Sequence, residues 1–445
     1  MANLNVCLIN DSFPPEIDGV ANAVVNYADI ISQAHGRAAV VTPDNPAADD
    51  SAFGFPVLRY PSVDLTRLVG YYAGFPFSPE LQKKLEGEGF DLIHSHCPIS
   101  STLLARSLRE RIRVPVVMTY HTKFDIDIAN AVRSKLLQEE AKRMLVLNIA
   151  ACDEVWTVSR GAGDNLRALG YRGEYIVMPN GVDFPLGRVE DALIKQVTGD
   201  YDLPEDVPVF LFVGRMMWYK GIRIILDALR LLREAGEDFR MVFVGGGADK
   251  EEIVARTGEL GLADRVFFSE PIRDRSRIRA WYCRADLFLF PSTFDTNGLV
   301  VREAAACALG SVLVAGSCAA EDVTDGESGF LIEENAESMA AKLRVLCRDR
   351  EAVRRIGETA QRELYMSWES SVARACDRYG AVIENYRSGR TAPHESLSDE
   401  FIHGIAESMA AYNRSRDWQR RRLRELSEGY GKLREELLHH LDRFM

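Results

Sequence analysis

The sequence predicts an α/β protein with two doubly wound domains that face each other across a cleft. The chain has 445 residues, which is too many for one ordinary hydrophobic core. Short apolar runs alternate with amphipathic helical patterns, as in parallel βαβ units. The alternation begins a second time after a segment at 179–206, whose Asn-Gly turn and scattered Pro and Gly residues suit a linker.

Each half of the chain supplies its own set of expected strands. Runs rich in Val, Ile, Leu and Phe without regular alternation favour strands that are buried on both faces of a sheet. The first half contains such runs at 5–10, 38–42, 91–96, 115–120, 154–159 and 175–179. The second half contains them at 207–215, 239–247, 265–270, 285–291, 311–316 and 329–332. Amphipathic segments such as 221–236 separate them and are expected to be helices.

We divide the chain into four parts. Residues 1–185 form a first Rossmann-like domain and residues 186–370 a second one. Residues 371–390 are expected to form a helix that returns toward the first domain. Residues 391–445 form a C-terminal helical extension, which is amphipathic and carries several Arg residues around Trp418. This tail could dock on the first domain, pair subunits or lie on an anionic membrane, and we expect membrane contact because glycines interrupt its Leu spacing.

Composition excludes several classes of protein. The formal net charge of −12 opposes binding to nucleic acid, which requires a basic surface. Eight cysteines without a CxxC pair indicate reduced thiols and neither a disulfide framework nor a zinc site. No apolar run approaches about 18 residues, and the N-terminus leads directly into a strand. We therefore expect a cytoplasmic protein whose contact with a membrane, if it occurs, is peripheral at the inner face.

Four charged residues of the second domain are expected at one edge of its sheet. Arg215 follows the first strand and Lys220 comes five residues later, while Asp295 and Glu303 flank another strand-to-helix turn. The carboxyl ends of parallel strands share one edge, where doubly wound sheets bind ligands. Each residue taken singly could be an ordinary surface group. Their coincidence favours a sugar nucleotide, whose diphosphate needs cations and whose vicinal hydroxyls need carboxylates.

The helix start after Asp295 completes this candidate site. Backbone amides at a helix N-terminus bind anions, because they lack intrahelical partners. The amides expected to face the donor belong to Thr296, Asn297, Gly298 and Leu299. Neither domain contains GxGxxG, so a plain dinucleotide dehydrogenase is not indicated.

Six motifs in a fixed order carry a resemblance to a known family. They are "FPPEIDGV", "DLIHSHCP", "TYHT", "PNGVD", "VGRMMWYKGI" and "DTNGLVVREA". Together they resemble the retaining GT-B glycosyltransferases of family GT4, and in particular bacterial lipid glycosyltransferases similar to diacylglycerol glucosyltransferase. The likeness spans residues 4–385. It implies transfer of a hexose, glucose in first place, from a UDP-sugar to an acceptor such as diacylglycerol, without a metal or other cofactor.

The resemblance also assigns roles to residues of the second domain. Glu303 matches the acid that holds the ribose hydroxyls of the donor. Asp295 occupies the position that faces the donor sugar, although the family usually has Glu there. Arg215 and Lys220 match the cations that stabilise the departing diphosphate.

In the first domain the resemblance points to two residues. His121 matches a cleft histidine that hydrogen-bonds the donor sugar close to the acceptor. Gly19 matches a glycine that approaches the phosphate, but Asp18 precedes it where many members have a second glycine. No residue stands out as a covalent nucleophile, so we expect front-face retention in which the leaving phosphate helps to take the proton of the acceptor.

Possible metal ligands and the acceptor complete the sequence-based expectations. Asp125 and Asp127 form a DxD pattern, and His94 and His96 could lie on one strand face, but DxD is common in loops and we expect no metal site. Aromatic and basic groups in the segments 69–85, 106–113 and 131–144 would suit an interfacial lipid site or, equally, ordinary packed loops and helix surfaces. A soluble sugar or phosphorylated acceptor, a sugar-nucleotide epimerase and a non-catalytic sugar-nucleotide binding protein remain alternatives.

Overall fold

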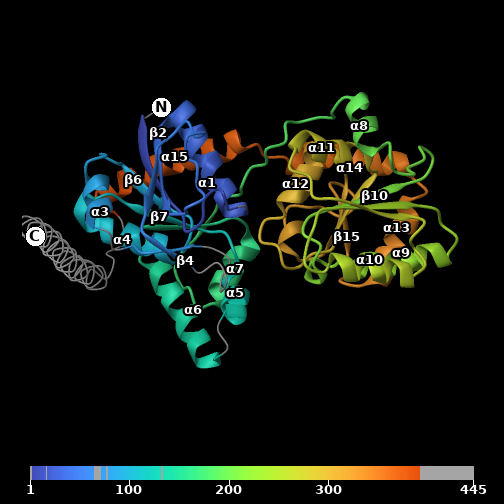
Figure 1. Ribbon diagram of the computed structural model, residues 1–445, viewed down its shortest axis with the longest axis horizontal. Coiled ribbons are helices and arrows are strands. Elements are labelled where there is room, and N and C mark those ends of the chain that lie inside the picture. The colour runs from blue at the N-terminus through green and yellow to red at the C-terminus, as the bar shows by residue number, and fades with distance from the viewer. Residues whose placement is uncertain (1–2, 17, 65–71, 77–78, 132–133, 391–445) are drawn as a thin grey trace, which may run out of the picture.

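The computed structural model describes residues 3–390 except residues 17, 65–71, 77–78 and 132–133. The chain forms two α/β lobes, one built mainly from the first half of the sequence and the other from the second half (Figure 1). The predicted fold class is therefore confirmed. The predicted tail at 391–445 lies outside the described residues.

The first lobe is built on a parallel sheet. Its order, within the described residues, is β3-β2-β1-β6-β7-β8-β9. The strands are β1 (Leu4–Ile9), β2 (Gly36–Pro43), β3 (Val57–Tyr60), β6 (Leu92–Ser95), β7 (Val116–Tyr120), β8 (Glu154–Thr157) and β9 (Ile176–Val177). A separate antiparallel pair consists of β4 (Ser62–Asp64) and β5 (Tyr72–Gly74).

The second lobe repeats this plan with a sheet in the order β12-β11-β10-β13-β14-β15 among the described residues. The strands are β10 (Val209–Val213), β11 (Arg240–Val244), β12 (Val266–Ser269), β13 (Leu287–Phe290), β14 (Ser311–Val314) and β15 (Phe330–Ile332). All residues of β10, β13 and β14 are buried, as expected for strands covered by helices on both faces.

Helices cover both sheets. Those of the first lobe are α1 (Gly19–Ile30), the π-helix η1 (Ile31–His35), α3 (Pro79–Glu86), α4 (Ser100–Ile112), α5 (Phe124–Ala131), α6 (Lys135–Ala150) and α7 (Arg160–Ala168). Those that follow are α8 (Asp191–Thr198), the 3₁₀ turn η2 (Trp218–Lys220), α9 (Ile222–Glu234), α10 (Lys250–Glu259), α11 (Arg275–Arg284), α12 (Leu299–Ala306), the 3₁₀ turn η3 (Cys318–Ala320), α13 (Ala336–Leu346), α14 (Arg350–Leu364) and α15 (Trp368–Arg387). No helix among the described residues is long and apolar enough to cross a bilayer.

The strand order places a ligand crevice in each lobe. β1 pairs in parallel with β2 on one side and with β6 on the other, and β10 pairs in the same way with β11 and β13. The chain order of the strands reverses at these two central strands. In doubly wound sheets, ligands bind beyond the carboxyl ends of the strands at such a switch point. The loops after β1 and β10 are therefore the expected places for a site.

The last described helix belongs to the core of the first lobe. α15 follows a bridge between Val182 and Ser367, and its apolar face packs with β1, α1 and β2. Trp368 and Tyr379 are buried in that core. The chain thus builds the first sheet, completes the second lobe and then returns to close the first.

Candidate active site

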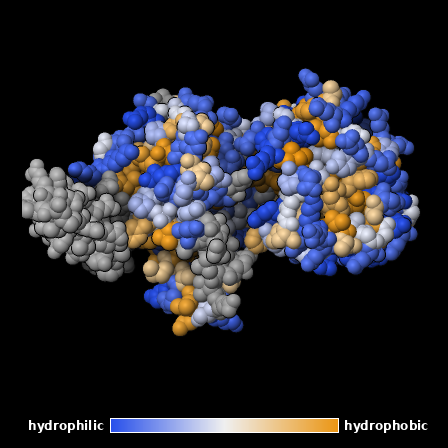
Figure 2. Space-filling model, viewed as in Figure 1, coloured by the Kyte–Doolittle hydropathy of each residue, from blue (hydrophilic) through white to orange (hydrophobic). Residues whose placement is uncertain are grey.

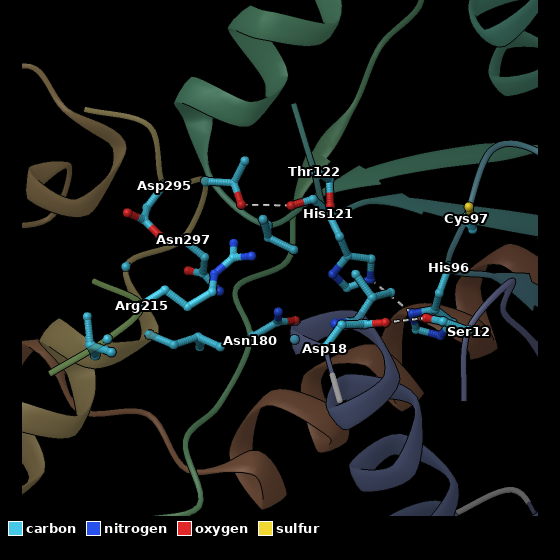
Figure 3. A pocket seen from close by; sticks show the side chains of 18 of the residues that line it. Ser12, Asp18, His96, Cys97, His121, Thr122, Asn180, Arg215, Asp295 and Asn297 are labelled. Atoms are coloured by element: carbon cyan, nitrogen blue, oxygen red, sulfur yellow. Dashed lines mark hydrogen bonds between the residues drawn. The ribbon is translucent and has the colours of Figure 1, made fainter. Parts of the chain in front are cut away.

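A cavity of about 730 Å³ lies between the two lobes. Its first-lobe wall follows the carboxyl ends of β1, β6 and β7, and its second-lobe wall follows β10 and β13. The structure brings most of the predicted site residues to this cavity: Gly19, His121, Arg215, Lys220, Asp295, Thr296, Asn297, Gly298 and Leu299. Figure 3 shows Arg215, Asp295 and Asn297 facing His121 across it.

The second-lobe wall provides an anion site. Arg215 follows β10, is exposed and forms no ion pair within the described part of the chain (Figure 3). α12 begins at Leu299, and no side chain caps its first amides. Its N-cap Gly298 has φ of 58°, and a Cβ there would lie 2.9 Å from Cα of Ala319, so the turn requires glycine. A guanidinium and uncapped amides at one wall suit a phosphate group.

Lys220 and Asp295 form an ion pair at the same wall. Lys220 Nζ donates to Asp295 Oδ1 at 2.6 Å, and Ser292 Oγ donates to Asp295 Oδ2 at 2.6 Å. Gly221 fixes this position of Lys220, because it has φ of 77° and a Cβ there would lie 2.3 Å from the carbonyl oxygen of Pro291. The two charges balance each other, so Arg215 is the cation that the cavity offers to an anion, while Asp295 is a carboxylate of fixed orientation.

Glu303 lies apart from the cavity lining. It is buried on α12, where Arg275 forms an ion pair with it and the Tyr282 hydroxyl donates to its Oε2 at 3.0 Å. Burial, together with the charge of Glu303, raises the pKa of Tyr282 well above its ordinary value. Both carboxylate oxygens thus have a donor. The role of Glu303 as a ribose ligand stays a prediction.

His121 lies on the opposite wall, directly after β7. It is 7% exposed, and its Nε2 lies 3.0 Å from Nδ1 of His96. Burial lowers the pKa of His121 to about 3, so the ring is neutral at physiological pH. The Thr296 hydroxyl donates to the carbonyl oxygen of His121 at 2.7 Å. This bond connects the turn before α12 in one lobe to the histidine of the other.

The start of α1 differs from that of α12. Asp18 caps α1, since its Oδ1 accepts the N–H groups of Val20 and Ala21 at 2.7 Å each. The Ser12 hydroxyl also donates to this carboxylate. Gly19 lines the cavity, but it lies beside a negative charge that occupies the helix N-terminus. Its contact with a phosphate therefore also stays a prediction.

Several polar residues that the sequence analysis did not assign to the donor site complete the first-lobe wall. Glu16, Asp18, His96 and Asn180 line the cavity, and among the described lining residues this lobe contributes no Lys or Arg. Asn180 stands in the quoted "PNGVD" motif. His96 ends the run that contains β6, next to β7, so its place in the sheet was the signal that could have found it.

The alternative metal ligands have other partners. Both ring nitrogens of His94 are hydrogen-bonded, Nδ1 to the Tyr379 hydroxyl at 2.6 Å and Nε2 to the Thr119 hydroxyl at 2.7 Å. Asp125 accepts from Asn165 at 3.2 Å. The side chain of Asp127 lies outside the described residues.

The segment 106–113 is only in part the exposed basic surface that the sequence allowed, because two of its four arginines are exposed and two are buried. Arg106 and Arg109 are 5% and 4% exposed. Arg106 donates to Asn148 at 3.0 Å, and Arg109 pairs with Asp153 at 3.3 Å. Two arginines of amphipathic α4 thus point inward, one to a residue of α6 and the other to the segment that follows α6. These two side chains are not available to a lipid.

Comparison with known proteins identifies the fold and the class of enzyme it resembles. Residues 17–184 match the model of the family "Glycosyltransferase Family 4", and residues 195–363 match that of "Glycosyl transferases group 1". An alpha-monoglucosyldiacylglycerol synthase of Streptococcus pneumoniae is 23% identical over 68% of this chain and 69% of its own length. A D-inositol 3-phosphate glycosyltransferase of Xylanimonas cellulosilytica is 28% identical over 65% and 72%. The HepE protein of Anabaena, in complex with UDP, superposes with a TM-score of 0.67 and 20% identity over 85% of this chain and 100% of that chain.

Proposed function

Because the chain belongs to the family 4 glycosyltransferases of the GT-B fold, we propose that it transfers glucose from UDP-glucose to a neutral membrane lipid such as diacylglycerol, with retention of anomeric configuration. The observation that carries this proposal is the division of charge across the cavity. The second-lobe wall offers Arg215 and the open start of α12, while the first-lobe wall offers carboxylates and histidines.

The second-lobe wall suits the donor. Breaking the bond between C1 of the sugar and the diphosphate places negative charge on the departing phosphate, and preorganised donors stabilise that charge. Arg215 and the amides at the start of α12 are placed to do so. Asp295, oriented by Lys220 and Ser292, is placed to accept hydroxyl groups of the sugar.

The reaction needs no covalent enzyme intermediate. A new bond forms between C1 and the acceptor oxygen on the face that UDP leaves, and the proton of the acceptor passes to the departing phosphate oxygen. His121 lies on the far wall from Arg215, where it can hydrogen-bond the sugar (Figure 3). Its low pKa keeps it neutral, so it contributes no charge to this step.

The first-lobe wall favours a neutral acceptor. Glu16 and Asp18 line it, and no Lys or Arg of this lobe does so among the described residues. Carboxylates repel a phosphorylated acceptor and accept hydrogen bonds from hydroxyl groups. A neutral hydroxyl compound therefore fits this wall better than a sugar phosphate does.

An exposed apolar face on the first lobe favours a lipid as that acceptor. α6 projects from the lobe, and Leu136, Leu137, Met144 and Leu147 on it are 54% to 73% exposed (Figure 2). Three of them, Leu136, Met144 and Leu147, recur at helical spacing and fall on one side of the helix. Exposed Lys135 and Arg143 on this helix are matched by exposed Glu139 and Glu140, so the face suits a bilayer surface through its apolar side chains.

The test supplies the purified full chain with UDP-glucose and one of three acceptors: diacylglycerol in mixed micelles, a free hexose or inositol phosphate. We expect an α-glucosyl lipid, detected by mass spectrometry and by the anomeric proton signal. Transfer to inositol phosphate or to the free hexose in place of the lipid would refute the proposed acceptor. A β-linked product would refute retention, and an interconverted sugar nucleotide would show an epimerase.

A matched pair of variants tests the role of α6. Replacing Leu136 and Met144 by Ser should reduce transfer to the lipid and leave the slow hydrolysis of UDP-glucose unchanged. Replacing Val345 by Ser, which is equally exposed at 66% but lies on α13 of the other lobe, should change neither rate. Equal lipid transfer by the α6 variant and the wild type would exclude this face from lipid contact.

A further inference from the structure

Three histidine rings lie in a row that runs from the first-lobe wall into the lobe. His94 and His96 belong to the run that ends β6, and His121 follows the neighbouring strand β7. Ring centroids are 3.9 Å apart between His94 and His96 and 5.2 Å apart between His96 and His121. His94 is held by two protein hydroxyl groups, as described above. His96 therefore contacts the ring of His94 on one side and the ring of His121, which faces the cavity, on the other.

One hydrogen atom lies in the hydrogen bond between His96 and His121, and it is attached to one of the two rings. Nδ1 of His96 lies 3.0 Å from Nε2 of His121, and the two residues are 2% and 7% exposed. Burial lowers the pKa of both rings, so each is neutral and carries one N–H. Either His96 donates to His121 or His121 donates to His96.

The two arrangements differ at the outer nitrogen of each ring. If His96 donates, its Nε2 has a bare lone pair, and Nδ1 of His121 carries a hydrogen. If His121 donates, Nε2 of His96 carries a hydrogen and Nδ1 of His121 is bare. Figure 3 shows that the edge of His121 opposite to His96 faces the cavity. The arrangement thus decides whether the cavity meets a donor or an acceptor.

The surroundings of His96 favour the first arrangement. Its Nε2 is buried and has no hydrogen-bond partner among the described residues. The ring of His96 also packs in a T-shaped arrangement with the ring of Tyr27, at 5.3 Å between ring centroids. Unpaired buried N–H groups are rarer in proteins than under-satisfied acceptors, because a buried donor without a partner loses its bond to water. A bare lone pair at this nitrogen is therefore preferred to an unpaired N–H.

We propose that His96 is a positioning residue that donates to Nε2 of His121 and so holds His121 with its hydrogen on Nδ1, where it donates to an oxygen of the sugar donor. This inference rests on the proposed function of the cavity and adds the direction of one hydrogen bond to it. His121 then acts as a hydrogen-bond donor and not as a base, in agreement with a reaction whose proton leaves with the phosphate.

Two substitutions of His96 test which residue donates in the hydrogen bond between positions 96 and 121, and not only whether a hydrogen bond is present. His96→Asn keeps an N–H near the place of Nδ1, whereas His96→Asp offers only acceptors and favours the reverse arrangement in His121. We expect His96→Asn to retain most of kcat and His96→Asp to lose about ten-fold, the value of one hydrogen bond. The dissociation constant of UDP should stay the same, since UDP binds at the other wall. Equal kcat in the Asp and Asn variants would refute the proposal.

A spectroscopic measurement decides the arrangement without any assay of transfer. In the full chain labelled with ¹⁵N-histidine, long-range ¹H–¹⁵N spectra report which ring nitrogen is protonated, and the His121→Asn variant assigns the signals of His121. We expect the hydrogen of His121 on Nδ1 in the wild type and on Nε2 in His96→Asp. Finding it on Nε2 in the wild type would overturn the proposal, even if glucosyl transfer is confirmed.

Two further controls keep the result independent of folding and of the acceptor. Thr119→Val removes a partner of His94 but leaves the bond between His96 and His121 in place, so the wild-type tautomer and kcat should persist. If no acceptor is glucosylated, the proposed function fails, but the tautomer of His121 is still measured. A folded His96→Asp protein whose His121 keeps the wild-type tautomer would show that His96 does not set it.

Discussion

Lowering the pH should destabilise the first lobe through its three buried histidines. Burial depresses the pKa of His94, His96 and His121 below the ordinary value of 6.5, for His121 to about 3. The unfolded chain binds a proton at each of these residues as the pH falls through 6.5, whereas the folded chain does not. The unfolded state then holds more protons, so the free energy of unfolding decreases as the pH falls.

The size of the effect follows from the ordinary pKa. Between pH 7.5 and pH 5.5, protonating one histidine in the unfolded chain alone lowers the free energy of unfolding by about 1.4 kcal/mol. Three such residues together give about 4 kcal/mol, which is a large part of the stability of a typical domain. The stability is fully present about one pH unit above 6.5 and is lost progressively as the pH falls through this value.

Urea denaturation of the wild type and of His121→Asn, each at pH 7.5 and pH 5.5, tests this reasoning. The variant should lose about 1.4 kcal/mol less than the wild type between the two pH values, since it lacks one of the three protons. Comparing the two proteins cancels the contributions of the carboxylates. Tyr27→Phe removes a hydroxyl group from the ring that packs against His94 and His96, but it removes no group that titrates in this range, so it should keep the wild-type dependence. An unchanged dependence in His121→Asn would refute the neutral, buried state of that ring.

Three further predictions concern the donor site, the metal and the tail. Arg215→Ala should lower kcat by about 10² to 10³, as for the loss of a preorganised donor. The control is Arg223→Ala, which should not lower kcat, because the guanidinium of Arg223 stacks on Trp218. A fully active Arg215→Ala enzyme would show that Arg215 takes no part in the reaction. Transfer should continue in excess EDTA, because Arg215 and backbone amides bear the charge of the leaving group, and recovery only on added Mn²⁺ would contradict this. A chain cut after residue 390 should sediment less with anionic vesicles than the full chain and equally little with neutral ones; equal binding to anionic vesicles would show that the tail is not an anchor, and a change from dimer to monomer would assign it to subunit pairing.

Much of the fold follows from local patterns in the sequence. The twelve expected strands are all present, because each is an apolar run and most of them are buried, although the edge strand β9 is only half-buried. β3, β4 and β5 were not predicted, since they lack a continuous apolar run and include polar groups such as Arg59. Arg59 is accommodated by Asp50 and by the carbonyl oxygen of Pro14, which the sequence pattern does not reveal.

The sequence could predict which residues lie at the same edge of a sheet, but not which side chains form ion pairs or hydrogen bonds with each other. The carboxyl ends of parallel strands lie together, so the sequence could place Arg215, Lys220 and Asp295 at one wall. The ion pair between Lys220 and Asp295, and the contact of Glu303 with Arg275, depend on side-chain geometry between distant segments. His96 was considered only as a metal ligand, because its bond to His121 depends on the register of two strands.

The return of α15 to the first lobe also governs the order in which a nascent chain can mature. The residues that complete the core around Trp156, among them Trp368 and Tyr379, are synthesised only after the whole second lobe. Domains usually fold as units in the order of synthesis. Here the second lobe, which is continuous in sequence, can finish on the ribosome while the first still exposes the apolar surface that α15 will cover. During translation the earlier half of the chain is thus the later to mature, and it is the half that would need protection from aggregation.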